Sequence, residues 1–302
     1  MTTVGADGAG YFSDPSPVRL TPSHAPSHRG RTQVFSGTTE AIMSCAYPVS
    51  ARCFSWTPVT IDAGTLRAEI AAAGSTCTNF QNLDAFQDDS GGWHAVLAIG
   101  VHSPSHPHHW TVLVHAHPGT GAAPGAVPLA WSADTVLSGS FSNPLDGNYD
   151  GKYFEDRGQL YLLYVSNLAP RPALRNGIMI QPMLSPTRLA PEGPTLLLAP
   201  GDWYGALGSE GYDHAQAELV EAPSIMKIAG KYALIYSTGG YRSLDYKAGV
   251  AWSDTLMPVP GGVTGRRRNP MSRVSGGSRA ASKSTISCSR SVHAGPISPA
   301  TR

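Results

Sequence analysis

The sequence predicts an all-β protein built from repeated groups of short strands. Three observations carry this prediction. The chain has 302 residues, of which only 14% are Asp, Glu, Lys or Arg, against roughly 25% in an average domain. It is rich in residues that form turns, with 33 Gly and 25 Pro. Its apolar runs are short, end at Gly or Asp turns and have no helical period, which favours antiparallel strands.

Composition also excludes several classes of protein. A hydrophobic content of 41% supports a sizeable core. The net charge of +1 gives no reason to expect nucleic acid or an anionic membrane as a partner. No apolar run approaches the ~20 residues that span a bilayer. The N-terminus lacks the basic and apolar regions of a signal peptide.

The first 80 residues carry few clear elements. Thr32–Ser36 is predicted as a short strand that ends at Gly37, and Gly64–Ala73 is the one plausible helix among residues 41–80. Of the four cysteines none forms a CxxC pair, so a zinc site of thiolates is not expected. A disulfide among Cys45, Cys53 and Cys77 is expected without a fixed pairing, and Cys288 lies far from them.

From residue 83 the strands become regular, and a unit recurs about every 70 residues. Each unit holds a strand, an acidic or Gly turn, an aromatic strand, a loop and a further strand. The predicted strands are 93–100, 109–115, 159–165, 177–181, 232–237 and 247–252. Repeated groups of short strands predict a β-propeller, whose blades are four-stranded sheets around a central channel. An unrelated series of hairpins in a β-sandwich is the alternative.

The character of the chain changes after Pro260. Residues 261–302 are rich in Ser, Arg and Gly, include Arg266, Arg267 and Arg268, and lack strand alternation. This composition predicts a disordered basic tail behind a single domain of residues 1–260. A nucleic-acid patch or a shifted reading frame at the end of a gene model are the alternatives.

Three acidic motifs stand far apart along the predicted domain. They are Asp14 in Ser13-Asp14-Pro15-Ser16, Asp150 in DGKYFEDRGQLYL, and Glu221 in Val220-Glu221-Ala222-Pro223. In type, order and spacing they resemble the motifs of glycoside hydrolase family 43, the five-bladed β-propeller arabinanases, arabinofuranosidases and β-xylosidases. The similarity is good over about residues 80–257.

The resemblance implies inverting hydrolysis of α-L-arabinofuranosidic or β-xylosidic bonds in plant cell-wall polysaccharide. Asp14 would be the general base and Glu221 the general acid. Asp150 would act as a pKa modulator, since a negative charge beside the acid raises its pKa. A catalytically inactive carbohydrate-binding propeller and a truncated homologue are the alternatives.

Each acidic residue has a competing interpretation. Asp14 could be a plain Asp-Pro turn. Asp146 competes with Asp150, but only Asp150 keeps the motif's spacing to Phe154 and Asp156. Glu218 is the substitute for Glu221. Both Asp88 and Asp156 are expected to shape turns.

The remaining expectations concern ligands. Sugar rings stack on aromatic faces, which makes Trp203, Tyr204 and Tyr241 the candidate substrate-binding residues, with core packing as the alternative. The histidines His102, His106, His108, His109, His115 and His117 could suggest a metal, but His106-Pro107-His108-His109 is interpreted as a surface loop because it is rich in Pro and no carboxylate stands at ligand spacing. The resemblance implies no cofactor, no metal, an oligo- or polysaccharide as partner, a monomer and an extracellular location.

The sequence departs from the family pattern in three places. Ala222 replaces a Gly of the fourth blade, and Asn82-Leu83-Asp84-Ala85 replaces the usual Trp-Ala-Pro of the second. Nothing after Pro260 resembles a fifth blade. A propeller without it would expose blade edges, which threatens stability and activity.

Overall fold

The structure is a computed structural model. It describes residues 13–17, 31–37, 42–48, 57–106, 108–121, 127–144, 147–169, 175–199, 219–238 and 247–257. The predicted tail 261–302 lies outside these ranges, as do Trp203, Tyr204 and Tyr241. Within them the chain forms four β-sheets and one helix, α1 (Leu66–Ala72).

The strands of the first two sheets follow one another along the chain. The first sheet has the order β1-β2-β3-β4, with β1 (Ser13–Pro17), β2 (Arg31–Gly37), β3 (Ile42–Pro48) and β4 (Thr57–Pro58). The second has the order β5-β9-β8-β7-β6, with β5 (Thr60–Asp62), β6 (Thr76–Gln87), β7 (Trp93–His102), β8 (Trp110–Pro118) and β9 (Ala130–Ser138). All these pairs are antiparallel except β5 with β9.

The third and fourth sheets repeat the arrangement. The third contains β10 (Asn148–Asp156), β11 (Gln159–Ala169) and β12 (Arg175–Ser185), and β12 also pairs with β13 (Arg188–Leu189) and β14 (Thr195–Leu198). The fourth has the order β15-β16-β17, with β15 (Val220–Ile228), β16 (Lys231–Thr238) and β17 (Lys247–Ser253).

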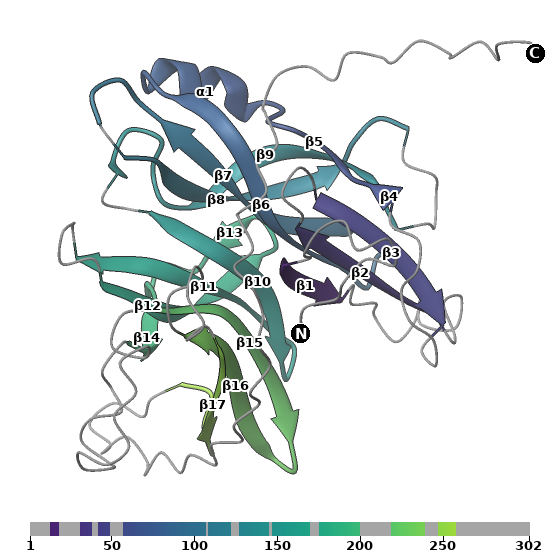
Figure 1. The fold of residues 1–302 in the computed structure, drawn as a ribbon. Coiled ribbons are helices and arrows are strands. Elements are labelled where there is room, and N and C mark those ends of the chain that lie inside the picture. Colours follow the sequence, from purple (N-terminus) through teal and green to yellow (C-terminus); the bar gives the residue numbers. More distant parts are fainter. Residues whose placement is uncertain are drawn as a thin grey trace, which may run out of the picture.

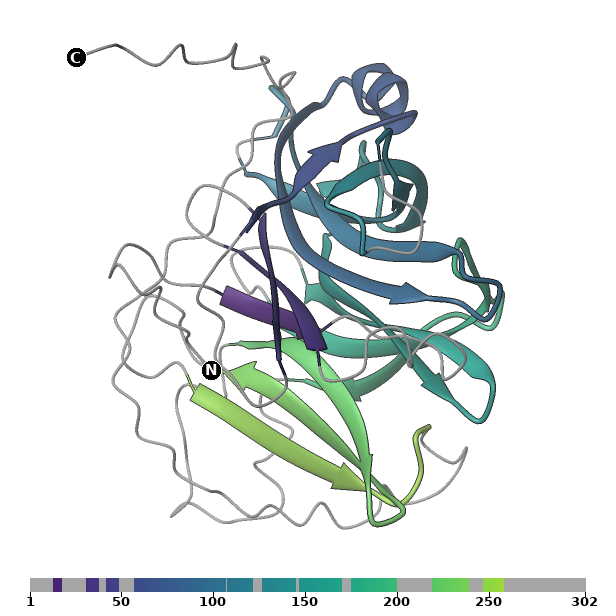
Figure 2. The same cartoon turned by 90° about the vertical axis from the view of Figure 1, so that its right-hand side faces the viewer.

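The sheets are arranged as the blades of a β-propeller. In Figure 1 they follow in chain order from the blue second sheet through the teal third sheet to the green fourth sheet, and the purple first sheet lies to the right. Figure 2 shows the same order after a quarter turn. One edge strand of each sheet contacts an edge strand of the next, in the series β1, β6, β10 and β15, which we call the inner strands. The predicted propeller is thereby confirmed, and a β-sandwich does not describe it.

The central sheets are buried on both faces, which explains their uninterrupted apolar strands. Along β7, Leu97 and Ile99 face a core that includes α1, while Val96 and Ala98 face the third sheet. Along β11, the alternating residues 162 and 164 pack toward the second sheet, and residues 163 and 165 toward the fourth. Packing between consecutive blades therefore holds the sheets together.

The predicted helix is shorter than expected for a steric reason. Gly64 has a φ of +54°, and a Cβ there would lie 2.1 Å from the carbonyl oxygen of Ala133. The chain must turn at this point, so the helix begins only at Leu66. Residues 41–80, in which the sequence predicted only the helix, also form β3, β4, β5 and the start of β6.

Two smaller points follow from the described residues. Cys77 is disulfide-bonded, as expected for a member of the cysteine group, and its partner lies outside the described side chains. No helix in the described ranges is long and apolar enough to cross a membrane.

Candidate active site

The inner strand of every sheet is interrupted by a shift of register at a corresponding place. Such a bulge bends the strand and re-aims its side chains. The shifts fall between Ser13 and Ser16 on β1, Gln81 and Asp84 on β6, Tyr149 and Lys152 on β10, and Glu221 and Ser224 on β15. Because inner strands of consecutive sheets are in contact, the bulges bring distant parts of the sequence together.

Three of these bulges contain a non-glycine residue with a left-handed backbone. The φ angles are +52° at Asn82, +53° at Asp150 and +50° at Ala222. Asp150 follows Asn82 by 68 residues and precedes Ala222 by 72. A left-handed conformation costs a non-glycine residue about 1–2 kcal/mol, and such strain is concentrated at functional sites. The left-handed conformation therefore recurs in three blades although it is unfavourable for non-glycine residues.

The carboxylate of Asp150 is held from two neighbouring blades. The Asn82 side-chain amide donates a hydrogen bond from Nδ2 to Oδ1 of Asp150. On the other side, the backbone N–H of Ala222 donates to Oδ2 at 2.7 Å. Asp150 is 5% exposed and Glu221, which directly precedes Ala222, is 7% exposed. Donors to a carboxylate favour its ionised form, so these contacts stabilise a negative Asp150 beside the Glu221 strand.

Packing fixes the bulge of β10 as well. Gly151 lies against the second blade, where a Cβ would come within 2.8 Å of Val96 and 2.9 Å of Leu113. Beyond the bulge, the backbone N–H of Tyr153 donates to Oδ2 of Asp84 at 2.9 Å. The position of Asp150 is therefore fixed by Gly151, which permits close contact with the second blade, and by the hydrogen bond of Tyr153 further along β10.

A pocket opens at the junction of the bulges. It is small, with a volume of about 10 Å³ that the centre of a water molecule can occupy. Its walls are Asn82, Leu83, Asp84, Asp150, Gly151, Lys152 and Ala222. The lining thus comes from β6, β10 and β15, in three different sheets.

The structure brings together only part of the predicted site. Asp150 and Glu221 lie on adjoining bulges, as described above. Asp14 lies on β1, at the bulge and not in a turn between strands, although its side chain is outside the described part. Asp146 and Glu218 also lie outside the described residues, together with the three aromatic candidates.

Asn82 and Asp84 were missed as site residues. The sequence carried a usable signal for Asn82, which stands four residues before Phe86 in NLDAF, as Asp150 stands four before Phe154 in DGKYF. Alignment of the units by this spacing would have placed Asn82 beside Asp150. The hydrogen bond from Tyr153 to Asp84 has no comparable sequence signal.

The two aspartates expected in turns have different roles. Asp88 shapes its turn, since its Oδ1 accepts hydrogen bonds from the backbone N–H of Ser90 at 2.9 Å and of Gly92 at 2.7 Å. Asp156 instead joins the third sheet to the fourth. It accepts from the Lys227 ammonium at 3.1 Å and the Tyr232 hydroxyl at 2.6 Å. Asp156 flanks the turn at Arg157 and Gly158, and its carboxylate also connects two blades, which the sequence did not indicate.

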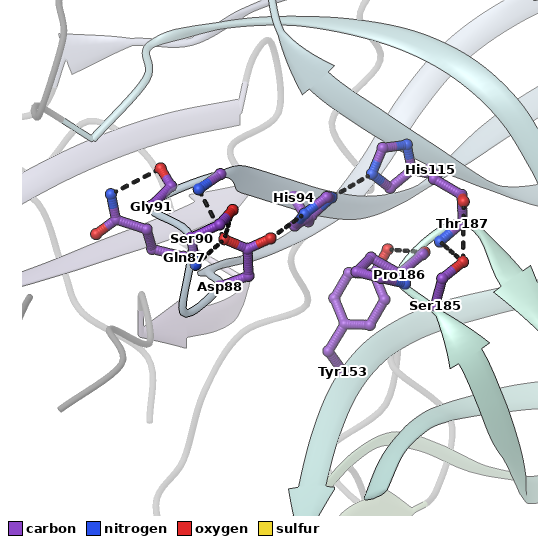
Figure 3. Close-up of polar contacts among 11 residues, drawn as sticks. Gln87, Asp88, Ser90, Gly91, His94, His115, Tyr153, Ser185, Pro186 and Thr187 are labelled. Carbon is purple, nitrogen blue, oxygen red and sulfur yellow. Dashed lines mark hydrogen bonds and ion pairs between the residues drawn. The ribbon is translucent and has the colours of Figure 1, made fainter. Parts of the chain in front are cut away.

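Two histidines outside the predicted surface loop, His94 and His115, are hydrogen-bonded across the second sheet. Figure 3 shows Asp88, His94 and His115 in a line across the second sheet. His94 Nε2 lies 3.1 Å from Asp88, His94 Nδ1 lies 3.0 Å from His115 Nε2, and His115 Nδ1 lies 2.7 Å from Asp134. We call these four residues the histidine chain. His115 is 2% exposed and lies on β8, in agreement with the strand predicted there.

The carboxylate partner of His115 and His117 was also unforeseen. Asp134 accepts from His117 Nδ1 at 2.9 Å as well, and its strand, β9, pairs with β8. In the described residues, no group of three or more His, Cys, Asp or Glu side chains is arranged to hold a metal ion. We describe the four residues of the histidine chain as a hydrogen-bonded network.

Burial and hydrogen bonds act on this network in opposite directions. Burial lowers the pKa of the His115 imidazole, although its hydrogen bond to Asp134 works against that shift. Burial opposes ionisation of Asp88 and of Asp134, but their hydrogen-bond partners outweigh it and lower the pKa of both carboxyls. Both aspartates are therefore ionised near neutral pH.

The fold is shared with several solved structures. A thermostable family-43 glycoside hydrolase matches with a TM-score of 0.56 and 18% identity, over 89% of this chain and 74% of its own. The α-L-arabinofuranosidase from Lactobacillus brevis matches with a TM-score of 0.55 and 16% identity, over 80% of this chain and 67% of its own.

A levansucrase is similar to the same degree. The structure from Bacillus subtilis has a TM-score of 0.53 and 12% identity, over 89% of this chain and 72% of its own. A scan of protein-family models and a search of curated proteins give no match. At these identities the likeness concerns the fold. The chain therefore has the β-propeller fold of the family-43 glycoside hydrolase structures.

Proposed function

We propose that this protein is a glycoside hydrolase whose acidic residues are Asp14, Asp150 and Glu221. One observation carries the proposal. The backbone N–H of Ala222 donates to Asp150 Oδ2 at 2.7 Å, which joins the strand of Glu221 to a second buried acidic residue at a bulge. On a fold shared with family-43 hydrolases, this arrangement supports Glu221 as a general acid beside a second carboxylate, and Asp14 on β1 would supply the general base that cleavage of a glycosidic bond also requires.

The proposed mechanism is inverting. Glu221 protonates the leaving oxygen of the glycosidic bond, and Asp14 removes a proton from the water that attacks the opposite face of the sugar. Asp150 stays ionised because two N–H groups donate to it, and its negative charge favours the protonated form of a neighbouring carboxyl. Trp203, Tyr204 and Tyr241 would stack on sugar rings.

The proposed substrates are α-L-arabinofuranosides or β-xylosides of plant cell-wall polysaccharide, cleaved outside the cell. The solved structures that share the fold include an arabinofuranosidase and a levansucrase. The fold alone therefore does not select the sugar, and a test needs aryl arabinofuranoside, aryl xyloside and sucrose side by side.

The experiment compares Glu221→Gln with the wild type on these three substrates. Loss of the general acid should lower kcat by roughly 10²- to 10⁴-fold on the substrate that is turned over. Glu155→Gln is the matched control, because Glu155 is an exposed residue of β10 and its change should leave kcat as it is. Thermal melting of both variants shows whether they are folded.

Two results would contradict the proposal. Wild-type turnover by a folded Glu221→Gln protein would remove Glu221 from the chemistry. Glycan binding without turnover at any pH would favour the alternative, a carbohydrate-binding propeller without catalytic activity.

A further inference from the structure

Asn82 occupies the same place in its blade as Asp150 occupies in the next. Both lie in the bulge of an inner strand, with φ angles of +52° and +53°. Asn is one of the few non-glycine residues that adopt this conformation readily. Asn82 therefore combines tolerance of a left-handed backbone with an amide group at the pocket wall.

The direction of the hydrogen bond between the two side chains is fixed by their chemistry. An ionised carboxylate only accepts hydrogen bonds, whereas the amide nitrogen of Asn only donates them. Asn82 must therefore present Nδ2 to Oδ1 of Asp150. With Oδ2 bound by the N–H of Ala222 at 2.7 Å, each oxygen has a donor, and the two donors come from the blades on either side.

Asp84 adds a second contact between β6 and β10. It lies at the other end of the same bulge, is 3% exposed and accepts from the N–H of Tyr153 at 2.9 Å. The bulge of β6 thus contacts β10 at two points, one on each side of Gly151. A shift of Asp150 along β10 would break both contacts.

We propose that Asn82 is a positioning residue that orients the Asp150 carboxylate and keeps it ionised. The inference rests on the proposed function, because the reaction gives this orientation its purpose. Asn82 acts through Asp150 and takes no part in the proton transfers. Its removal should therefore affect kcat far more than KM.

Two substitutions separate this role from a merely structural one. Asn82→Gly removes the amide and accepts the left-handed backbone without strain. Asn82→Asp keeps the shape and the backbone tolerance but places an acceptor against an acceptor, so one of the two carboxyls must bind a proton. Ala229→Gly is the matched control, because Ala229 is exposed and left-handed, with a φ of +49°, in the turn between β15 and β16.

The expected loss in kcat is on the order of 10- to 100-fold for Asn82→Gly, since the lost hydrogen bond has a charged acceptor. Asn82→Asp should lose more and shift the pH profile of kcat. Ala229→Gly should match the wild type. A measurement without substrate accompanies these assays: carboxyl carbon-13 NMR, with the Asp150 signal assigned from Asp150→Asn. The Asp150 titration midpoint should move up in Asn82→Gly.

The outcomes distinguish the two proposals. If the wild type turns over no glycoside but the Asp150 midpoint moves up in Asn82→Gly, the proposed function fails and the contact with Asn82 stands. If the wild type is active and folded Asn82→Gly and Asn82→Asp proteins keep its kcat and its Asp150 titration, Asn82 positions nothing. A loss of kcat that accompanies a lower melting temperature, while the Asp150 titration midpoint stays unchanged, would also overturn the inference.

Discussion

Two polar clusters lie in this protein, and they are built in opposite ways. The histidine chain runs across β7, β8 and β9 and the turn before β7, all within the second sheet. The cluster around Asp150 joins residues of three sheets. The first needs no left-handed residue among its four members, whereas the second contains three.

The side chains of the histidine chain are directed at one another. Asp88 and Asp134 accept hydrogen bonds from the two ends of the chain, and each of His94 and His115 presents one ring nitrogen to a carboxylate and the other to its neighbouring ring. These contacts all lie within the second sheet.

Buried polar residues in a repeat protein can therefore have two different roles. A closed network within one sheet stabilises that sheet. A carboxylate that is held by neighbouring blades, at a pocket and at the cost of backbone strain, is placed for another purpose. From residue type alone, the histidines would be the first candidates for a functional site.

The sharpest test exchanges one aspartate for asparagine in each cluster. Asp150→Asn removes the negative charge at the pocket and should lower kcat on the order of 100-fold. Asp134→Asn keeps one acceptor for two histidines, so it should cost about 1 kcal/mol of unfolding free energy and leave kcat unchanged. Kinetics and urea unfolding on both variants decide. If Asp134→Asn lowered kcat and Asp150→Asn left it unchanged, the distinction between the two clusters would be wrong.

A second test concerns the packing that places Asp150. Gly151→Ala would put a Cβ within 2.8 Å of Val96 and 2.9 Å of Leu113. Such overpacking should cost about 1–3 kcal/mol of unfolding free energy and lower kcat, because Asp150 is the preceding residue. Gly158→Ala is the control for kcat, because a Cβ at its φ of +78° strains the backbone although nothing lies within 4 Å of it, and Gly158 does not line the pocket. A change in stability with unaltered kcat would separate Gly151 from the site.

The smallest effect concerns pH and belongs to the histidine chain. Burial holds the pKa of His115 below its ordinary 6.5, so the unfolded state binds more protons and stability falls as the pH drops below that value. Asp88 and Asp134, whose pKa values lie below their ordinary 3.8, add a loss only in stronger acid. Urea unfolding at about pH 7.5 and about pH 5 should show a decrease for the wild type and a smaller one for His115→Phe. Equal decreases would remove His115 as the cause.

Much of the fold could be predicted from the sequence. The predicted strands, such as 93–100, 159–165 and 232–237, lie within β7, β11 and β16 because their apolar runs are bounded by Gly and Asp turns. The 70-residue repeat predicted the blades. In residues 41–80 the local pattern is weaker, and pairing with β9 and with the rest of the first sheet decides where β3, β4 and β5 form.

For the proposed site, the sequence alone predicted Asp150 and Glu221, since their motifs are local. Only the tertiary structure decided how Asp150 is held. Its donors stand 68 and 72 residues away along the chain, and no local pattern expresses a contact between two blades. The histidine chain shows the same limit, because His115 meets Asp134 only through the pairing of β8 with β9. Strand pairing and blade contact bring these groups together, and both are properties of the folded chain.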